Sequence, residues 1–317
     1  MMKRLLGRSE VAVSAIGMGC WAIGSDWGAV DDTESVRALQ RALDLGVTFF
    51  DTSNAYGGGR SEHLIGQALA DRRGQAVIAT KFGYIVNERT GRINRNDASP
   101  EAIRRTCEDA LRRLNTDYID LFQFHLGSYP IKEAGEVRET LEALVAEGKI
   151  RFYGWSTDDP KRARFFAEGL HCAAVQHELN LFNDNAPMLA VCDECNLASI
   201  NRSPLAMGLL TGKYKADAEF PANDVRRASR LWDYFQRDKM PALLQKLDAV
   251  RDILTSGSRT LAQGTLGWLL ARSERTIPIP GFKTVTQVEE NVGTLRFGPL
   301  TAAQMQEIER LLARSEG

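Results

Sequence analysis

The sequence lacks a long apolar run and an excess of charge of either sign. No segment of the 317 residues approaches the roughly 18 unbroken apolar residues of a membrane-spanning helix, so we expect no membrane span. The 40 lysines and arginines balance 41 aspartates and glutamates, for a net charge of -1. A chain so balanced lacks the charge pattern that is typical of proteins bound to nucleic acid or to anionic membranes. Composition therefore argues against both classes of partner.

Cysteine is scarce, and its spacing matches no disulfide framework. The five residues are Cys20, Cys107, Cys172, Cys192 and Cys195. Cys192 and Cys195 form one C-x-x-C without a second pair, whereas zinc takes about four ligands. We therefore expect reduced thiols and no metal. The first residues, MMKRLLGRSE, lack the apolar core of a signal peptide, which makes a cytoplasmic location the expectation.

What the sequence does contain is a regular alternation of short apolar and amphipathic segments. We expect strands at 16–20, 47–50, 77–79, 118–124, 150–155, 173–176, 197–201 and 276–279. Thr33 and Ser61 are expected to cap the first two helices, and Ser99 followed by Pro100 indicates the start of a third. A short N-terminal hairpin and an extra C-terminal helix from about Thr301 complete the pattern. Because no linker-like composition divides it, we expect one domain over residues 1–317.

Alternating strands and helices admit two α/β architectures, an open doubly wound sheet and a closed barrel. An open sheet would hold a dinucleotide on G-x-G-x-x-G/A, and residues 17–22 fit that spacing. However, residues 23–28 are rich in glycine and tryptophan and indicate a loop, so the helix that would hold a pyrophosphate is missing. The sequence therefore favours a single (β/α)8 TIM barrel.

Chemistry in such barrels takes place at the C-terminal ends of the strands. The residues expected there are Trp21, Asp51, Lys81, His125, Ser156, Gln176, Ser203 and Gly281. Neighbouring strands lie about 4.8 Å apart, so Asp51, Lys81 and His125 could converge, with Tyr56 on the loop above them. A structural salt bridge, a core histidine and a surface tyrosine would explain the same residues one by one. Their joint order and spacing favour a functional site.

Six segments of the chain, between about Leu5 and the final helix, resemble the motifs of the aldo-keto reductases. They are 51–57 (DTSNAYG), 79–81 (ATK), 123–126 (QFHL), 154–156 (GWS), 203–213 (SPLAMGLLTGK) and 279–284 (IPGFKT). The resemblance implies NADPH-dependent carbonyl reduction by a catalytic tetrad of Asp51, Tyr56, Lys81 and His125. Tyr56 would donate the proton, and the Lys81 ammonium would lower its pKa from about 10. Asp51 would orient Lys81, and His125 would polarise the carbonyl.

The same resemblance implies which residues bind NADPH. Ser156 and Gln176 would bind the nicotinamide carboxamide, and Lys283 would bind the 2′-phosphate at a helix start, which favours NADPH over NADH. The other implied contacts are Gly19, Trp21, Asp51, Arg202, Ser203, Pro204, Leu205, Gly208, Gly281, Thr284, Gln287, Glu290 and Asn291. Arg202 departs from the family, which commonly has an aromatic there, and could stack on a ring or reach a phosphate. Thr284 and Gln287 also fit a capping box.

The expected substrate is a small aldehyde, sugar aldehyde or ketone. Its pocket could be lined by Trp21, Trp27, Tyr84, Trp232, Tyr234 and Phe235, and the long insertion at 213–238 could form a lid. Two other functions are open at this point. A cofactor-holding binding or sensor protein, like the potassium-channel β subunits, would share the fold, and an isomerase or aldolase would use Lys81 as a Schiff base. The sequence does not specify an oligomeric state.

Overall fold

The computed structural model describes residues 1–24, 27–221, 224–228 and 233–312. Within these ranges eight strands form one parallel sheet, in the order β12-β11-β10-β9-β8-β5-β4-β3. The strands are β3 (Met18–Gly19), β4 (Phe49–Asp51), β5 (Val77–Phe82), β8 (Ile119–Phe124), β9 (Ile150–Ser156), β10 (Cys172–Glu178), β11 (Ala198–Arg202) and β12 (Thr276–Pro278). Each overlaps a strand expected from the sequence.

The first and last strands meet and close the sheet into a barrel. Gly17 donates its backbone N–H to Pro278, and Gly19 donates to Pro280, both at 3.0 Å. Gly19 also forms a parallel bridge with Gly281. A Cβ on Gly19 would lie 2.5 Å from a backbone oxygen of the facing segment, so only glycine allows this close approach. The predicted (β/α)8 barrel is confirmed.

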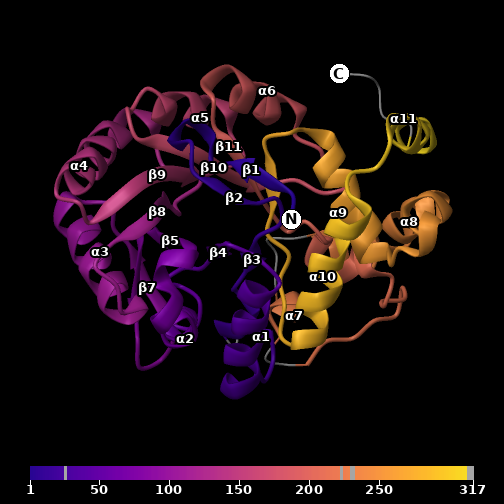
Figure 1. Ribbon diagram of the computed structural model, residues 1–317, viewed down its shortest axis with the longest axis horizontal. Helices are drawn as coiled ribbons and strands as arrows, with labels where there is room; N and C mark the ends of the chain where they lie inside the picture. The colour runs from indigo at the N-terminus through magenta and orange to yellow at the C-terminus, as the bar shows by residue number, and fades with distance from the viewer. Residues whose placement is uncertain (25–26, 222–223, 229–232, 313–317) are drawn as a thin grey trace.

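Helices surround the barrel on its outer side (Figure 1). They are α1 (Asp32–Asp44), α2 (Arg60–Leu69), α3 (Pro100–Leu114), α4 (Ala134–Ala146), α5 (Pro160–Ala167), α6 (Ala186–Cys195), α9 (Leu261–Arg272) and α10 (Val285–Phe297). Three further helices are α7 (Val225–Ala228), α8 (Met240–Leu254) and α11 (Ala302–Leu311). Helix α11 is the extra C-terminal helix expected from about Thr301, and Thr301 caps it.

Helix α3 shows how local sequence sets these elements. The Ser99 side chain accepts from the N–H of Ala102 and Pro100 occupies the first turn, so the helix start is fixed locally. Its buried face consists of Ile103, Cys107, Leu111 and Leu114, spaced for one side of an α-helix. That face packs against the sheet, while the opposite face is polar.

Two expected helix caps were wrong. Helix α1 is capped by Asp31, whose carboxylate accepts from the N–H of Glu34 at 2.7 Å, so Thr33 lies inside the helix. Helix α2 begins after Gly59, and Ser61 also lies inside. The Ser61 hydroxyl donates instead to the carbonyl of Cys20 at 2.8 Å. The Ser61 side chain, which the local sequence predicted to cap the helix, therefore makes a tertiary contact instead.

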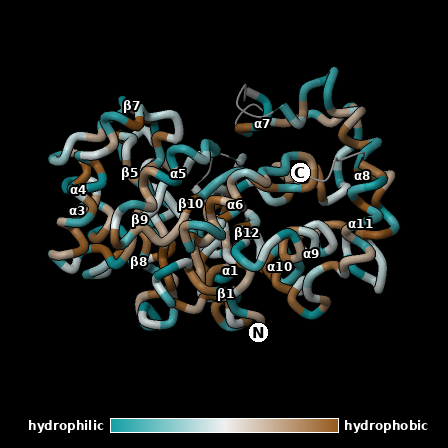
Figure 2. Tube along the Cα trace, turned by 90° about the horizontal axis from the view of Figure 1, so that it is seen from above, coloured by the Kyte–Doolittle hydropathy of each residue, from teal (hydrophilic) through white to brown (hydrophobic). Residues whose placement is uncertain are grey.

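Two hairpins cover the ends of the barrel. The expected N-terminal hairpin, β1 (Lys3–Leu5) and β2 (Ala12–Ser14), closes one end, where Leu6 and Val13 join the buried side chains of the barrel interior. The second, β6 (Tyr84–Asn87) and β7 (Arg92–Asn96), was not expected. Figure 2 places β7 and α7 at one end of the molecule and β1 at the other. The hairpin of β6 and β7 comes directly after β5 in the chain, so it lies at the end of the barrel that contains the carboxyl end of β5.

Candidate active site

The carboxyl ends of adjacent strands bring Asp51, Lys81 and Gln123 together. Asp51 on β4 lies beside Ala79 of β5, and Lys81 on β5 lies beside Gln123 of β8. The loop between β4 and α2 carries Tyr56, whose hydroxyl lies 3.1 Å from the Lys81 ammonium nitrogen. Asp51 and Lys81 therefore converge as strand spacing predicted, and Tyr56 lies beside them.

The Lys81 ammonium is fully buried and has three oxygen partners. Its Nζ donates to Asp51 Oδ1 at 2.6 Å, to the Thr52 carbonyl at 2.8 Å and to the Tyr56 hydroxyl at 3.1 Å. The side chains of Lys81 and Asp51 are 0 % and 2 % exposed. Burial by itself would lower the pKa of Lys81, but Asp51 and Tyr56 raise it above its ordinary value. The lysine is therefore a cation held against a phenol.

The second carboxylate oxygen of Asp51 is also satisfied. Its Oδ2 accepts from Gln123 Nε2 at 2.9 Å and from Gln176 Nε2 at 2.7 Å. Sequence reasoning missed Gln123, although this residue stands two positions before His125 in a recognised motif. Gln176, expected to bind a carboxamide, orients the carboxylate in this structure. Two amide donors and one ammonium therefore hold both oxygens of the Asp51 side chain in place.

Tyr56 departs from the sequence expectation in the direction of its pKa. Burial raises the pKa of Tyr56, the Lys81 ammonium lowers it in part, and the Asp51 carboxylate raises it again. The net shift of the pKa is upward, although the contribution of Lys81 is downward, as the sequence predicted. Lysine acts as expected, but desolvation of the phenolate outweighs it. Tyr56 is therefore a protonated phenol at neutral pH.

His125 follows β8 directly and faces the same phenol. Its Nδ1 lies 3.3 Å from Ser53 Oγ. The ring stands edge-on to Tyr84, with centroids 4.9 Å apart, and edge-on to Tyr56, with centroids 6.3 Å apart. Burial, followed by the charges of Lys81 and Arg202, lowers the pKa of His125 well below its ordinary value. The imidazole is therefore neutral.

Three of the expected aromatic residues lie at this site. Trp21 is nearly parallel to Tyr56, with centroids 5.8 Å apart and planes at 23°. Trp27 stands edge-on to Trp21 at 5.2 Å. Together with Tyr84 beside His125, they surround the phenol and the imidazole with aromatic surface.

The other expected aromatic residues have different surroundings. The Tyr234 hydroxyl donates to Glu178 and accepts from Asn180 Nδ2. Phe235 packs edge-on against Phe220, with centroids 4.7 Å apart. Trp232 lies outside the described residues. Phe235 therefore packs within the insertion, and Tyr234 joins the insertion to the end of β10.

Two carboxylates form ion pairs with Arg202 at the end of β11. Its guanidinium pairs with Asp158 and, at 3.4 Å, with Glu178. Ser156, at the end of β9, lies beside Gln176 in the strand register and is 7 % exposed. Ser156 therefore faces the same mouth of the barrel as the tetrad. The Arg202 side chain is held by two acidic residues.

The loop after β11 has an unusual backbone. Ser203, Met207 and Gly208 have φ of 51°, 54° and 95°, and such left-handed conformations in residues other than glycine store strain that is common at functional sites. Pro204 and Leu205 lie in the same turn. A Cβ on Gly208 would lie 3.6 Å from Lys213 Cε and 3.8 Å from Arg226 Nη1. Two cationic side chains thus reach over this glycine.

A third cation, Lys283, approaches from the start of α10. Burial lowers the pKa of Lys283, Asp224 raises it, and Arg226 and Lys213 lower it further. Its Nζ donates to the Trp27 carbonyl. Arg226 pairs with Asp224 at 2.6 Å. Three cations and one carboxylate therefore gather beside the strained loop.

The N-terminus of α10 differs in one detail from the expected capping box. Thr284 is the cap and its hydroxyl accepts from the N–H of Gln287 at 3.3 Å. The Gln287 side chain accepts from the N–H of Lys283 at 2.7 Å instead of returning to Thr284, so the box is half formed. Asn291 donates to the Gly281 carbonyl at 3.3 Å, and Glu290 precedes it, partly buried.

Two other findings bear on the site. Within the described ranges no cluster of three or more His, Cys, Asp or Glu side chains is arranged to hold a metal ion. No helix in the described part of the chain has the length and apolar content needed to cross a membrane.

Comparison with known proteins identifies the family. The model of the aldo/keto reductase family matches residues 15–313. The chain belongs to the aldo/keto reductase family. This aldo/keto reductase is 34% identical over 313 residues to "Aldo-keto reductase yakc [NADP(+)]" of Schizosaccharomyces pombe, covering 96% of this chain and 90% of the relative.

Two further relatives are named for reactions of small molecules. "NADH-specific methylglyoxal reductase" of Escherichia coli is 30% identical to this aldo/keto reductase over 332 residues, covering 99% of this chain and 100% of the relative. The solved structure of the glycerol dehydrogenase AKR11B4 from Gluconobacter oxydans superposes with a TM-score of 0.84 at 31% identity, covering 98% and 95% of the two chains.

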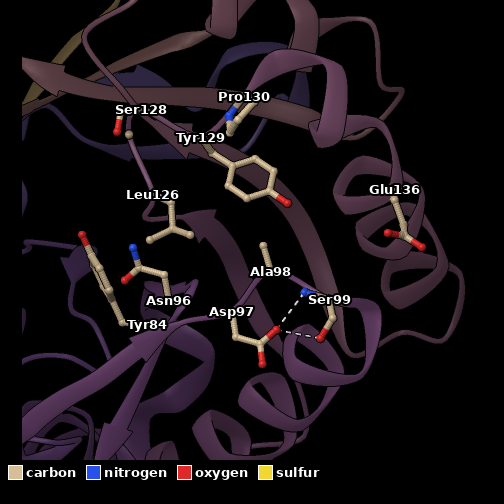
Figure 3. Close-up of a pocket in the computed structure, with 11 residues that line it drawn as sticks. Tyr84, Asn96, Asp97, Ala98, Ser99, Leu126, Ser128, Tyr129, Pro130 and Glu136 are labelled. Carbon is tan, nitrogen blue, oxygen red and sulfur yellow. Dashed lines mark hydrogen bonds between the residues drawn. The ribbon is translucent and has the colours of Figure 1, made fainter.

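A cavity of about 640 Å³ in this aldo/keto reductase is lined in part by Tyr84 and by Leu126, the residue that follows His125. Tyr84 forms one wall, Leu126 and Tyr129 another, and Asp97 and Glu136 supply carboxylates (Figure 3). Tyr84 thus contacts the His125 ring and also lines the cavity. The β6–β7 hairpin, which was not predicted from the sequence, contributes Tyr84 and Asn96 to the lining of this cavity.

Proposed function

We propose that this chain reduces small aldehydes or ketones to alcohols with NADPH, and that Tyr56 is the proton donor. One observation carries the proposal. The Lys81 ammonium lies 3.1 Å from the Tyr56 hydroxyl and 2.6 Å from the buried Asp51 carboxylate. When bound, NADPH supplies the hydride to the carbonyl carbon.

The residues of the chain divide the remaining work. As negative charge builds on the carbonyl oxygen, Tyr56 transfers its hydroxyl proton there, and the phenolate that results lies against the Lys81 ammonium. A proton from solvent then restores the phenol. The upward shift in the pKa of Tyr56 keeps the acid protonated before each turnover. Neutral His125 would donate from Nε2 to the carbonyl oxygen while its Nδ1 accepts from Ser53.

The chain also has residues suited to NADPH. Lys213, Arg226 and Lys283 would hold the phosphates beside the loop of Ser203 and Gly208, because cations and left-handed backbone favour anions. One detail fits a bound dinucleotide: Trp27 Nε1 is buried with no hydrogen-bond partner among the described residues. Lys283 would contact the 2′-phosphate, in line with the NADP(+) label of the fission-yeast relative.

The other implied contacts belong to the same proposal. Ser156 would bind the carboxamide, and Gln176 would share its amide between that group and Asp51. Trp21 would cover the reacting centre beside Tyr56. The remaining length of the dinucleotide would be lined by Gly19, Gly281, Thr284, Gln287, Glu290 and Asn291. Arg202, which is held by two carboxylates, would position the loop that begins at Ser203.

Small carbonyl compounds fit the surroundings of Tyr56. Trp21, Trp27 and Tyr84 form an aromatic enclosure there, and the cavity beyond Tyr84 carries carboxylates and a phenol that suit hydroxyl groups. The relatives named for methylglyoxal and glycerol act on molecules of this size. We therefore propose hydroxylated aldehydes and small ketones as the first candidate substrates.

Oxidation of NADPH, followed by absorbance with a panel of aldehydes and ketones, tests the proposal. Steady consumption of NADPH with small carbonyl compounds is the expected result. Tightly held NADPH without consumption across the panel would indicate a cofactor-holding binding protein and overturn the proposal. The Lys81→Met variant is the control, because background oxidation would persist in it.

A further inference from the structure

A carboxylate from another helix occupies the start of α10. Glu34, in the first turn of α1, accepts from the backbone N–H of Val285 with Oε1 at 2.9 Å. The Glu34 side chain is 29% exposed, and Arg37 lies 3.5 Å from its other oxygen. Helices α1 and α10 pack side by side around the barrel (Figure 1). The contact joins residues 251 positions apart, so it belongs to the tertiary structure rather than to ordinary capping.

The same helix start carries the cation proposed to bind the 2′-phosphate. Lys283 lies two residues before Val285, and its backbone N–H is already bound by Gln287. The first N–H groups of a helix and its dipole attract one anion. Glu34 provides an anion there in the protein itself. A second anion next to it meets repulsion from the carboxylate, while Lys283 supplies attraction.

Carboxylates and cations select differently between the two nicotinamide dinucleotides. An acidic side chain near the adenosine ribose favours the hydroxyl of NADH, and a cation favours the phosphate of NADPH. We propose that Glu34 is a specificity-determining residue that offsets Lys283 and thereby reduces the preference of this protein for NADPH over NADH. The inference rests on the proposed function, because it takes the 2′-phosphate to lie at the start of α10.

The Glu34→Gln variant tests the proposal with little change in shape. Glutamine retains an oxygen for the Val285 N–H and removes only the charge. The control is Glu289→Gln, which removes the same charge further along α10, where Glu289 is 45% exposed and pairs with Arg41 at 2.8 Å. Dissociation constants for NADPH, NADH, 2′,5′-ADP and 5′-ADP are measured by calorimetry at low and high salt.

Glu34→Gln should tighten NADPH and 2′,5′-ADP by about fivefold or more at low salt, with NADH and 5′-ADP unchanged within about twofold. High salt should shrink the gain, because screening weakens charge repulsion. Glu289→Gln should change none of the four. Equal changes for all four ligands, no change, or weaker NADPH would overturn the role of Glu34. If the parent protein binds neither dinucleotide, the proposed function itself fails, so the two failures are distinct.

Discussion

Replacing Asp51 with asparagine should destabilise the protein strongly. Asp51 and Lys81 are almost fully buried, and their charged atoms lie 2.6 Å apart. In Asp51→Asn the ammonium keeps only neutral partners, the Thr52 carbonyl and the Tyr56 hydroxyl. Removing one partner of a buried ion pair costs about 3–5 kcal/mol. The amide would also present an N–H₂ either to Lys81 or to the two glutamine donors, which adds to the loss.

Urea unfolding followed by circular dichroism measures this loss. The pKa of Lys81 is raised in the folded protein, so the pair stabilises fully below the ordinary lysine pKa and is lost only as pH rises through the folded value. The loss in Asp51→Asn should therefore stay constant across neutral pH. The double variant Asp51→Asn with Lys81→Met, which removes both charges, should recover part of the stability.

A surface pair provides the control. Arg104 and Glu147 are also 2.6 Å apart but are 42% and 36% exposed, so Glu147→Gln should leave the free energy of unfolding nearly unchanged. A loss of under about 1 kcal/mol in Asp51→Asn, the range of exposed pairs, would refute the reasoning. Equal loss in the single and double variants would refute it as well.

Three other outcomes follow from the structure. The kcat for carbonyl reduction should not change with pH near about pH 6.5, because the pKa of His125 is well below its ordinary value. A fall in kcat toward acid near that pH, absent in His125→Asn, would contradict a neutral imidazole. Lys283→Ala should weaken NADPH by about tenfold and NADH little, measured by calorimetry with Lys215→Ala as the charge control; equal weakening of both would remove the 2′-phosphate assignment. Ser99→Ala should lower the free energy of unfolding by about 1 kcal/mol, because the hydroxyl caps α3; no change in urea unfolding would argue against the cap.

Much of the barrel could be predicted because its signals are local. Apolar segments gave the strands, and Ser99 with Pro100 gave the start of α3. The order of Asp51, Lys81 and His125 on successive strands gave the site, because parallel strands end at the same mouth. These inferences need only periodicity, capping and strand spacing.

The remainder depends on contacts across the fold. Ser61 resembles a cap, but its hydroxyl binds the Cys20 carbonyl. Lys81 lowers the pKa of Tyr56, yet the extent of burial decides the net direction, and burial is not visible in a motif. Gln123 on β8 donates a hydrogen bond to Asp51 on β4, with β5 between the two strands. The carboxylates that pair with Arg202 come from the loop after β9 and from the end of β10, so its surroundings could not be predicted from its neighbours in sequence.

The most direct test of the central claim is Tyr56→Phe, compared with the parent protein in both kcat and NADPH binding. The substitution removes one hydroxyl and keeps the ring beside Trp21. Carbonyl reduction should fall by about 10²–10⁴-fold, while the dissociation constant for NADPH should change by less than about twofold. Reduction at near-parental rates in Tyr56→Phe would show that the proton comes from another group.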